Sequence, residues 1–166
     1  MAVVTQVPKL ALIRIAQGAG SLADFGYTRA GSEIEKINNS ISVPSDEHGG
    51  DEGPEVDAQA LPPTYIIRLN LTKFEKSVFE QLESAVSGGS AGVFAAADIG
   101  ALYVGASKYF RVLISTADSS WVRNFPVCRP IDAQAYNLGT RFVEGSVSFQ
   151  AIRNLSSGVI WNTSTS

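Results

Sequence analysis

The stretch from Gly26 to Leu82 decides the fold of this chain. It reads GYTRAGSEIEKINNSISV (26–43), PSDEHGGDEGPEVDAQALPP (44–63), TYIIRLNLT (64–72) and KFEKSVFEQL (73–82). A weakly alternating segment is followed by a long acidic segment, then by a sharply alternating segment and an amphipathic one. The order predicts a β-rich unit with one flanking helix.

The segment Thr64–Thr72 carries the clearest strand pattern. Its odd-numbered residues, from Tyr65 to Leu71, are all large and apolar, whereas Arg68 and Asn70 lie between them. Alternate residues of a strand face opposite sides of a sheet, so one face belongs to the core and the other is partly solvated.

A helix is predicted to follow this strand, at about residues 73–86. Thr72 can cap it, with Glu75 at the capping-box position, and Gly88 can end it. The apolar stripe that should pack on a sheet consists of Phe74, Val78, Phe79, Leu82 and Val86.

The segment before the acidic stretch is ambiguous. Ile34, Ile37 and Ile41 recur at helical spacing, but Asn38 and Asn39 between them are poor helix formers. We therefore predict an irregular strand with a β-bulge near the two asparagines. Residues 45–63 are rich in acids, Gly and Pro, and are predicted to be a long loop.

The other predicted strands complete a mainly β (α+β) fold. They are Lys9–Ala16, Tyr109–Ser115, Val122–Cys128, Phe142–Ile152 with a bulge near Gly145, and Ser157–Trp161. We expect an antiparallel β-sandwich or half-barrel of about seven strands, with the helix at 73–86 and the acidic loop at 45–63. Residues 1–166 should form a single domain with an N-terminal arm (1–7) and a loose C-terminal tail (162–166).

Composition excludes several classes of protein. The net charge of −3 provides no basic surface for nucleic acid. Cys128, the single cysteine, can form neither an internal disulfide nor a zinc site by itself. The apolar run Leu10–Ile13 is too short for a signal peptide and no segment is long enough to span a membrane, so we expect assembly in the cytoplasm.

The acidic stretch concentrates charge. Six of the 16 acidic residues lie between positions 46 and 57, where there is no Lys or Arg. Carboxylates and flexible glycines could hold calcium, although their spacing does not follow the EF-hand pattern. The preferred interpretation is a solvated segment that becomes ordered against a neighbouring subunit.

No set of catalytic residues is found. His48 is the only histidine, and no Gly-x-Ser-x-Gly motif is present. Paired carboxylates such as Asp46 and Glu47 could serve a glycosidase, but they lack a rigid aromatic-lined cleft. We expect no enzyme, no catalytic or metal-binding residue and no cofactor. The residues predicted to contact other subunits are Asp46, Glu47, Asp51, Glu52, Glu55, Asp57, Trp121 and Trp161.

The order of these segments resembles that of bacteriophage tail tube proteins and their relatives in contractile injection systems. The resemblance rests on FGYTRAGSEIE, SDEHGGDEGPEVD, YIIRLNLT, KFEKSVFEQL and RFVEGSVSFQAI. It implies a small β-sandwich or half-barrel with one helix, of which six copies close a ring and rings stack into a tube. It also implies that the long loop contacts other subunits or the next ring.

On this resemblance, the chain is a virion protein of a phage tail, and DNA passes through its channel without specific binding. Its partners would be other copies of itself, other tail proteins and, in contractile tails, a sheath. A head–tail joining, tail terminator or capsid decoration protein is an alternative, and a calcium- or ligand-binding module that uses the acidic loop is another.

Overall fold

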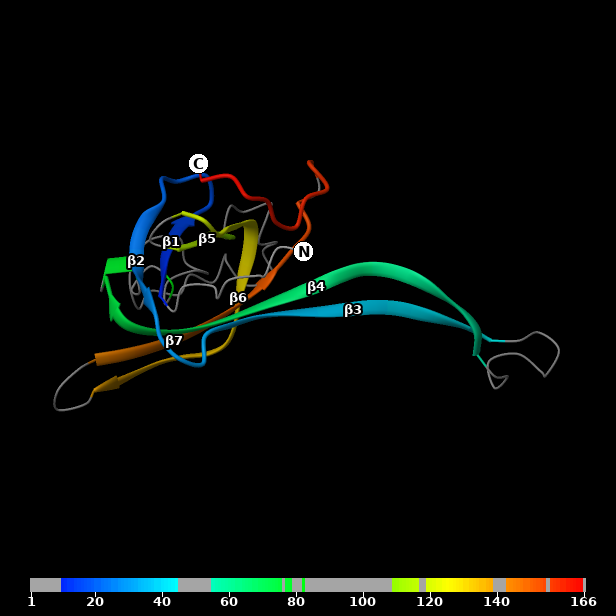
Figure 1. Cartoon of the computed structure of the whole chain (residues 1–166), viewed down its shortest axis with the longest axis horizontal. Helices are drawn as coiled ribbons and strands as arrows, with labels where there is room; N and C mark the ends of the chain where they lie inside the picture. Colours follow the sequence, from blue (N-terminus) through cyan, green and yellow to red (C-terminus); the bar gives the residue numbers. More distant parts are fainter. Residues whose placement is uncertain are drawn as a thin grey trace, which may run out of the picture.

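The computed structural model describes residues 10–44, 55–75, 77–78, 82, 109–116, 119–138, 143–154 and 156–165. These residues form a seven-stranded sheet in which every strand pair is antiparallel (Figure 1). The strands are β1 (Ala11–Gln17), β2 (Ala23–Thr28), β3 (Glu33–Pro44), β4 (Glu55–Phe74), β5 (Phe110–Thr116), β6 (Val122–Leu138) and β7 (Val143–Ala151).

The sheet closes on itself. The strand order is β2-β1-β5-β6-β7-β4-β3, and β2 also pairs with the end of β4, where Gly26 lies opposite Phe74. Every strand except β3 therefore belongs to a closed barrel, and closure removes the open edges that a two-sheet sandwich would present. The number of strands agrees with the prediction, and of the two predicted architectures the half-barrel is closer than the sandwich, because one sheet supplies the whole wall.

Aromatic and branched side chains fill the barrel. Phe25, Phe110, Phe125 and Phe149 are almost completely buried, and the rings of Phe110 and Phe149 lie 6.1 Å apart between centroids. Along β4 the inward-facing residues alternate, and Ile67, Leu69 and Leu71 confirm the face predicted for this segment. Such tightly packed apolar contacts are the main source of the stability of a small domain.

Cys128 belongs to this core. Its side chain is fully buried, and desolvation raises the pKa of the thiol well above its ordinary value. The reactive thiolate is therefore not formed near neutral pH unless the barrel opens. We expect the native protein to resist a thiol reagent such as Ellman's reagent and to react stoichiometrically in denaturant. Rapid labelling of the native protein would contradict this packing.

The predicted acidic loop at 45–63 is wrong over its second half. β4 begins at Glu55 and pairs with β3 from Glu55, opposite Pro44, to Arg68, opposite Glu33. Two long strands therefore run side by side and extend away from the barrel as an arm (Figure 1). This part of β4 is rich in acids and prolines, as loops are. Its composition is not apolar because the arm lies away from the core.

The helix predicted at 73–86 cannot begin as predicted. Lys73 and Phe74 end β4, and Thr72 belongs to the strand rather than to a helix cap. Ser77, Val78 and Leu82 have helical backbone, and Val78 and Leu82 are buried in the core as the apolar stripe requires. Most of the remaining range lies outside the described residues, so the helix itself stays a prediction.

Three further differences concern strands. β2 was not predicted, and the segment Ser157–Trp161 forms no strand; the C-terminal segment instead makes one bridge, between Asn124 and Asn162. β7 pairs with β4 without interruption at Gly145, and the irregularity lies in β6 instead, between Ile131 and Ala135. A register shift does lie between Ile37 and Asn39, near the bulge predicted at Asn38 and Asn39, but the extra residue belongs to the partner strand β4 and not to β3.

Candidate assembly interface

The arm formed by β3 and the first part of β4 is the most distinctive surface of the molecule. From Glu55 to Thr64, β4 pairs only with β3 among the described residues, since its pairing with β7 begins at Tyr65. A two-stranded ribbon is only marginally stable in water without a further strand or a packed face. The arm therefore has the structure expected of a segment that is completed by a partner.

The arm also exposes apolar side chains. Ile37, Ile41 and Leu61 are exposed by 37%, 51% and 38%, respectively. Residues at alternate positions of β3 share a face, and Leu61, which pairs with Asn39, lies on that same face. All three side chains therefore lie on one face of the arm, which continues the outer surface of the barrel. Clustered exposed apolar residues are typical of protein contact sites.

A β-bulge lies within the arm. Between Ile37 and Asn39 of β3, the partner strand advances from Thr64 to Leu61 and so contains one extra residue, at the Pro62–Pro63 pair. Prolines lack the N–H that a ladder needs, which suits them to a bulge. The Asn39 Nδ2 atom donates to Pro62 O at 2.9 Å and to the Thr64 hydroxyl at 3.0 Å, holding the two strands together across this point.

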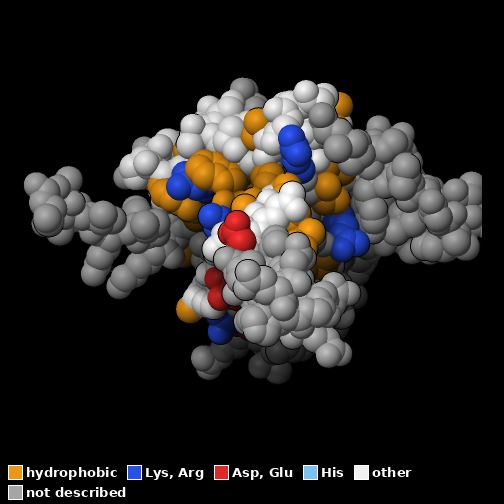
Figure 2. Space-filling model, turned by 90° about the vertical axis from the view of Figure 1, so that its right-hand side faces the viewer, with side chains coloured by type: hydrophobic (Ala, Val, Ile, Leu, Met, Phe, Trp, Pro, Cys, Tyr) orange, Lys and Arg blue, Asp and Glu red, His pale blue; other side chains and the backbone are white. Residues whose placement is uncertain are grey.

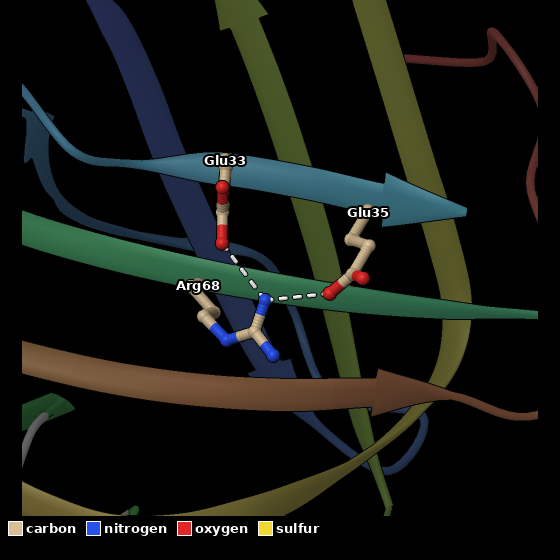
Figure 3. Close-up of polar contacts among 3 residues, drawn as sticks. All are labelled: Glu33, Glu35 and Arg68. Atoms are coloured by element: carbon tan, nitrogen blue, oxygen red, sulfur yellow. Dashed lines mark hydrogen bonds and ion pairs between the residues drawn. The ribbon is translucent and has the colours of Figure 1, made fainter. Parts of the chain in front are cut away.

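A charged cluster lies where the arm joins the barrel (Figure 3). The Arg68 Nη1 atom on β4 lies 2.8 Å from Glu33 Oε1 and 2.7 Å from Glu35 Oε2, both on β3. Hydrogen bonds to Glu35 and then Glu33 raise the pKa of Arg68 above its ordinary value. Side chains of this cluster are exposed, so its electrostatic contribution to stability is small.

Apart from the inner edge of the arm, where β4 from Glu55 to Thr64 pairs only with β3, two further long stretches of sheet edge are open among the described residues. One is the outer edge of β3 along its whole length, because β3 pairs only with β4. The other is the edge of β6 beyond Cys128, where pairing with β5 stops while pairing with β7 continues. Open edges present unpaired backbone donors and acceptors and readily take up another strand.

The acidic residues predicted to contact other subunits fall into two groups. Glu55 begins β4, and Asp57, which is exposed, accepts a hydrogen bond from the Ala58 backbone N–H at 2.7 Å. Asp46, Glu47, Asp51 and Glu52 lie in the segment that connects β3 to β4, outside the described residues. In sequence, residues 45–54 connect Pro44 at the end of β3 to Glu55 at the start of β4.

The two predicted interface tryptophans form a separate cluster. Trp121 and Trp161 are half-buried and bracket Arg123, whose guanidinium carbon lies 5.0 Å and 4.3 Å from their ring centroids. Asn124 and Asn162 exchange two backbone hydrogen bonds of 2.9 Å beside this cluster. The cluster therefore fastens the C-terminal segment to β6. A role of either tryptophan in subunit contacts stays a prediction.

Replacing Trp161 by Ala should release the C-terminal segment while keeping the barrel. The change removes a cation–π contact and half-buried apolar area, so we expect a loss of about 2–3 kcal/mol in the free energy of unfolding. Denaturant unfolding measures the loss, and hydrogen exchange should show faster exchange at the Asn124 and Asn162 amides. Trp161→Phe, which retains a ring, should lose less. Unchanged exchange at both amides would contradict the proposed clamp.

The described residues contain no group of three or more His, Cys, Asp or Glu side chains that could hold a metal ion. A depression of about 440 Å³ opens at one end of the barrel, with Leu69 and Ile114 among its lining and Arg29, Glu33 and Trp121 beside them. It is lined by neither His nor Cys. Among the described residues, no helix is long and apolar enough to cross a membrane.

Comparisons with known proteins agree with this architecture at the level of fold. No family model and no curated protein matches the sequence. One similar solved structure is a chain of the virion of a native gene transfer agent particle, with a TM-score of 0.52 and 12% identity over 88% of this chain and 93% of that one. The chain has the fold of phage-tail-type structural proteins.

Two further structures show the same fold. A chain from the tail of an empty gene transfer agent particle, computed with helical refinement and C6 symmetry, has a TM-score of 0.50 and 11% identity over 84% of this chain and 88% of that one. A chain from the six-fold symmetrised baseplate of the anti-feeding prophage has a TM-score of 0.50 and 8% identity over 90% and 92%. In each comparison the shared fold extends over at least 84% of this chain and at least 88% of the other.

The sequence indicated part of this site only. It identified the acidic segment. It did not predict the paired strands of the arm, or that Ile37, Ile41 and Leu61 share one exposed face. Their pattern could have been found by treating 33–43 and 57–64 as paired strands, because only cross-strand pairing places Leu61 beside β3.

Proposed function

We propose that this chain is a structural subunit of a phage-tail-like particle and that copies of it assemble into rings of six that stack as a tube. The open-edged apolar arm carries this proposal, because it is a surface that only a partner can complete. Supporting it, the similar chains come from a tail, a virion and a baseplate, two of them with six-fold symmetry. The subunit acts by self-association and requires no cofactor.

The two open edges suit head-to-tail assembly. The strands β3, β4, β7 and β6 lie side by side in this order, so the open edges belong to opposite sides of one four-stranded wall. Because adjacent strands of this wall are antiparallel and β3 and β6 are three strands apart, β3 and β6 run in opposite directions. A rotation about an axis nearly parallel to the strands then places β3 of one copy antiparallel to β6 of the next. Head-to-tail contacts of this kind generate closed rings.

The apolar face of the arm would then pack against the neighbouring copy. Full burial of an exposed Ile or Leu contributes about 1.5–3 kcal/mol. Because Ile37, Ile41 and Leu61 are already partly buried, each would contribute part of this value, together with a row of backbone hydrogen bonds in every contact. Seen from the side toward which the arm extends, the described surface displays many hydrophobic side chains, with Lys or Arg and some Asp or Glu side chains beside them (Figure 2). We infer that the acidic segment between β3 and β4 contacts such a surface on another copy.

Site-directed cross-linking tests the ring. In a Cys128→Ala background, Ile131→Cys on β6 is combined in turn with Glu33→Cys, Glu35→Cys or Ile37→Cys on β3, which lie on the same face of the wall as Ile131, and treated with a short bis-maleimide. Head-to-tail pairing should give, for at least one combination, a ladder of covalent oligomers that ends at six. The single-cysteine parents, which are the controls, should give no ladder. Products that stop at the dimer, or only monomers at every concentration, would contradict the proposal.

A further inference from the structure

The open edge of β3 carries excess negative charge. Arg68 is the only partner that the described structure gives to Glu33 and to Glu35, so two carboxylates share one guanidinium. The exposed fractions of the two glutamate side chains are 57% and 46%. Part of this negative charge is therefore neither neutralised nor shielded by the chain itself.

The open edge of β6 carries a spare positive charge. Arg129 is exposed, and its Nε atom donates to the Gln150 side-chain oxygen at 2.9 Å, which is a neutral acceptor. None of the ion pairs found among the described residues includes Arg129. Its guanidinium retains donors for a carboxylate.

These charges lie on the same face of the four-stranded wall. Glu35 pairs with Ile66, Ile66 with Gln150, and Gln150 with Arg129, so the four residues form one row across the strands. Paired residues point to the same side of a sheet. Glu35 ends the row at the β3 edge, and Arg129 ends it at the β6 edge.

We propose that Arg129 of one copy binds the Glu33 and Glu35 carboxylates of the next copy across the β6–β3 contact. The partner is a second copy of this chain, chosen because the two edges are complementary in both backbone hydrogen bonding and charge. The inference rests on the proposed head-to-tail ring and adds the side chains that orient each contact. Complementary charges fix the register and exclude the reversed pairing, in which Glu would meet Glu and Arg would meet Arg.

Charge reversal in mixed assemblies tests this contact. Arg129→Glu alone places three acids at every contact, and Glu35→Arg alone places Arg beside Arg129. We expect each variant to need about tenfold or more protein for assembly, measured by sedimentation. The double variant, which restores opposite charges, should assemble within about threefold of wild type. An equimolar mixture of the single variants should also recover, because every contact between alternating copies then has Arg at one of the positions 35 and 129 and Glu at the other.

Controls separate the contact from folding and from the ring itself. Arg153→Glu, an equal charge change at an exposed residue outside the four-stranded wall, should assemble as wild type does. The buried Cys128 thiol should stay protected in every variant, and Arg129→Gln and Glu35→Gln provide milder changes if a reversal destabilises the fold. Wild-type assembly by both single variants, or a mixture and double variant that do not recover, would refute the contact while leaving the ring intact. Failure of the wild type to assemble would refute the ring and this contact together.

Discussion

A chain whose arm is cut back should fold normally and fail to assemble. We expect this result when residues 40–60 are replaced by Asn-Gly, which closes a two-residue hairpin turn between the paired residues Asn39 and Leu61. Among the described residues, the removed part pairs only within the arm, so the barrel core is untouched. The change deletes Ile41, an open strand edge and the acidic segment together.

The expected loss of association is large. Removing one apolar contact and several edge hydrogen bonds should weaken each subunit contact by about 3 kcal/mol or more, which is at least about a hundredfold in affinity. Sedimentation velocity compares the variant with wild type at equal concentration, and circular dichroism with the Cys128 labelling test confirms the fold. Ser42→Ala, on the opposite face of the arm from Ile41, is the matched control and should assemble normally. Normal tubes from the shortened chain would show that the arm is not the contact.

The second large effect is on stability, and it concerns Phe149. Its side chain is fully buried in β7, the strand between β4 and β6, and its ring packs against Phe110. Phe149→Ala should reduce the free energy of unfolding by about 3–5 kcal/mol, because it removes a large apolar group and leaves a cavity. That is a large fraction of the stability of a typical domain, about 5–15 kcal/mol.

Chemical denaturation measures this effect, with thiol labelling as a second observation. Opening of the barrel exposes Cys128, so the variant should label faster than wild type under native conditions. Phe149→Leu, which keeps most of the apolar volume, should lose less, and Ser148→Ala on the outward side of β7 should change stability little. A denaturation midpoint of Phe149→Ala close to that of wild type would contradict the central position of this ring in the core.

The sequence predicted those strands whose side chains have a core to face. Thr64–Thr72 alternates because one of its faces is buried. Tyr109–Ser115 is almost continuously apolar because residues on both of its faces are buried. β2 was not predicted because Gly26 interrupts it and a bulge at Phe25 shifts its register against β1. Its burial pattern has only two buried residues, Phe25 and Thr28, which is too few to form a visible period.

The arm and the barrel closure could not be predicted, for a different reason. Both are properties of pairing between distant residues: Asp57 lies opposite Val43, and Phe74 lies opposite Gly26. The arm has no inward-facing row in the isolated chain, so its residues have the composition of a loop. The resemblance to tail proteins rested on the order of segments, and the fold comparison supports that resemblance although few residues are identical.

Electron microscopy of the purified full-length chain tests the central claim most directly. Negatively stained protein, concentrated until association is complete, should form hollow rings with six-fold rotational symmetry that stack into tubes. Rings that never stack would support the proposed ring contact but would indicate a neck, terminator or baseplate position instead of a tube. Particles that remain single barrels at every concentration would contradict the account.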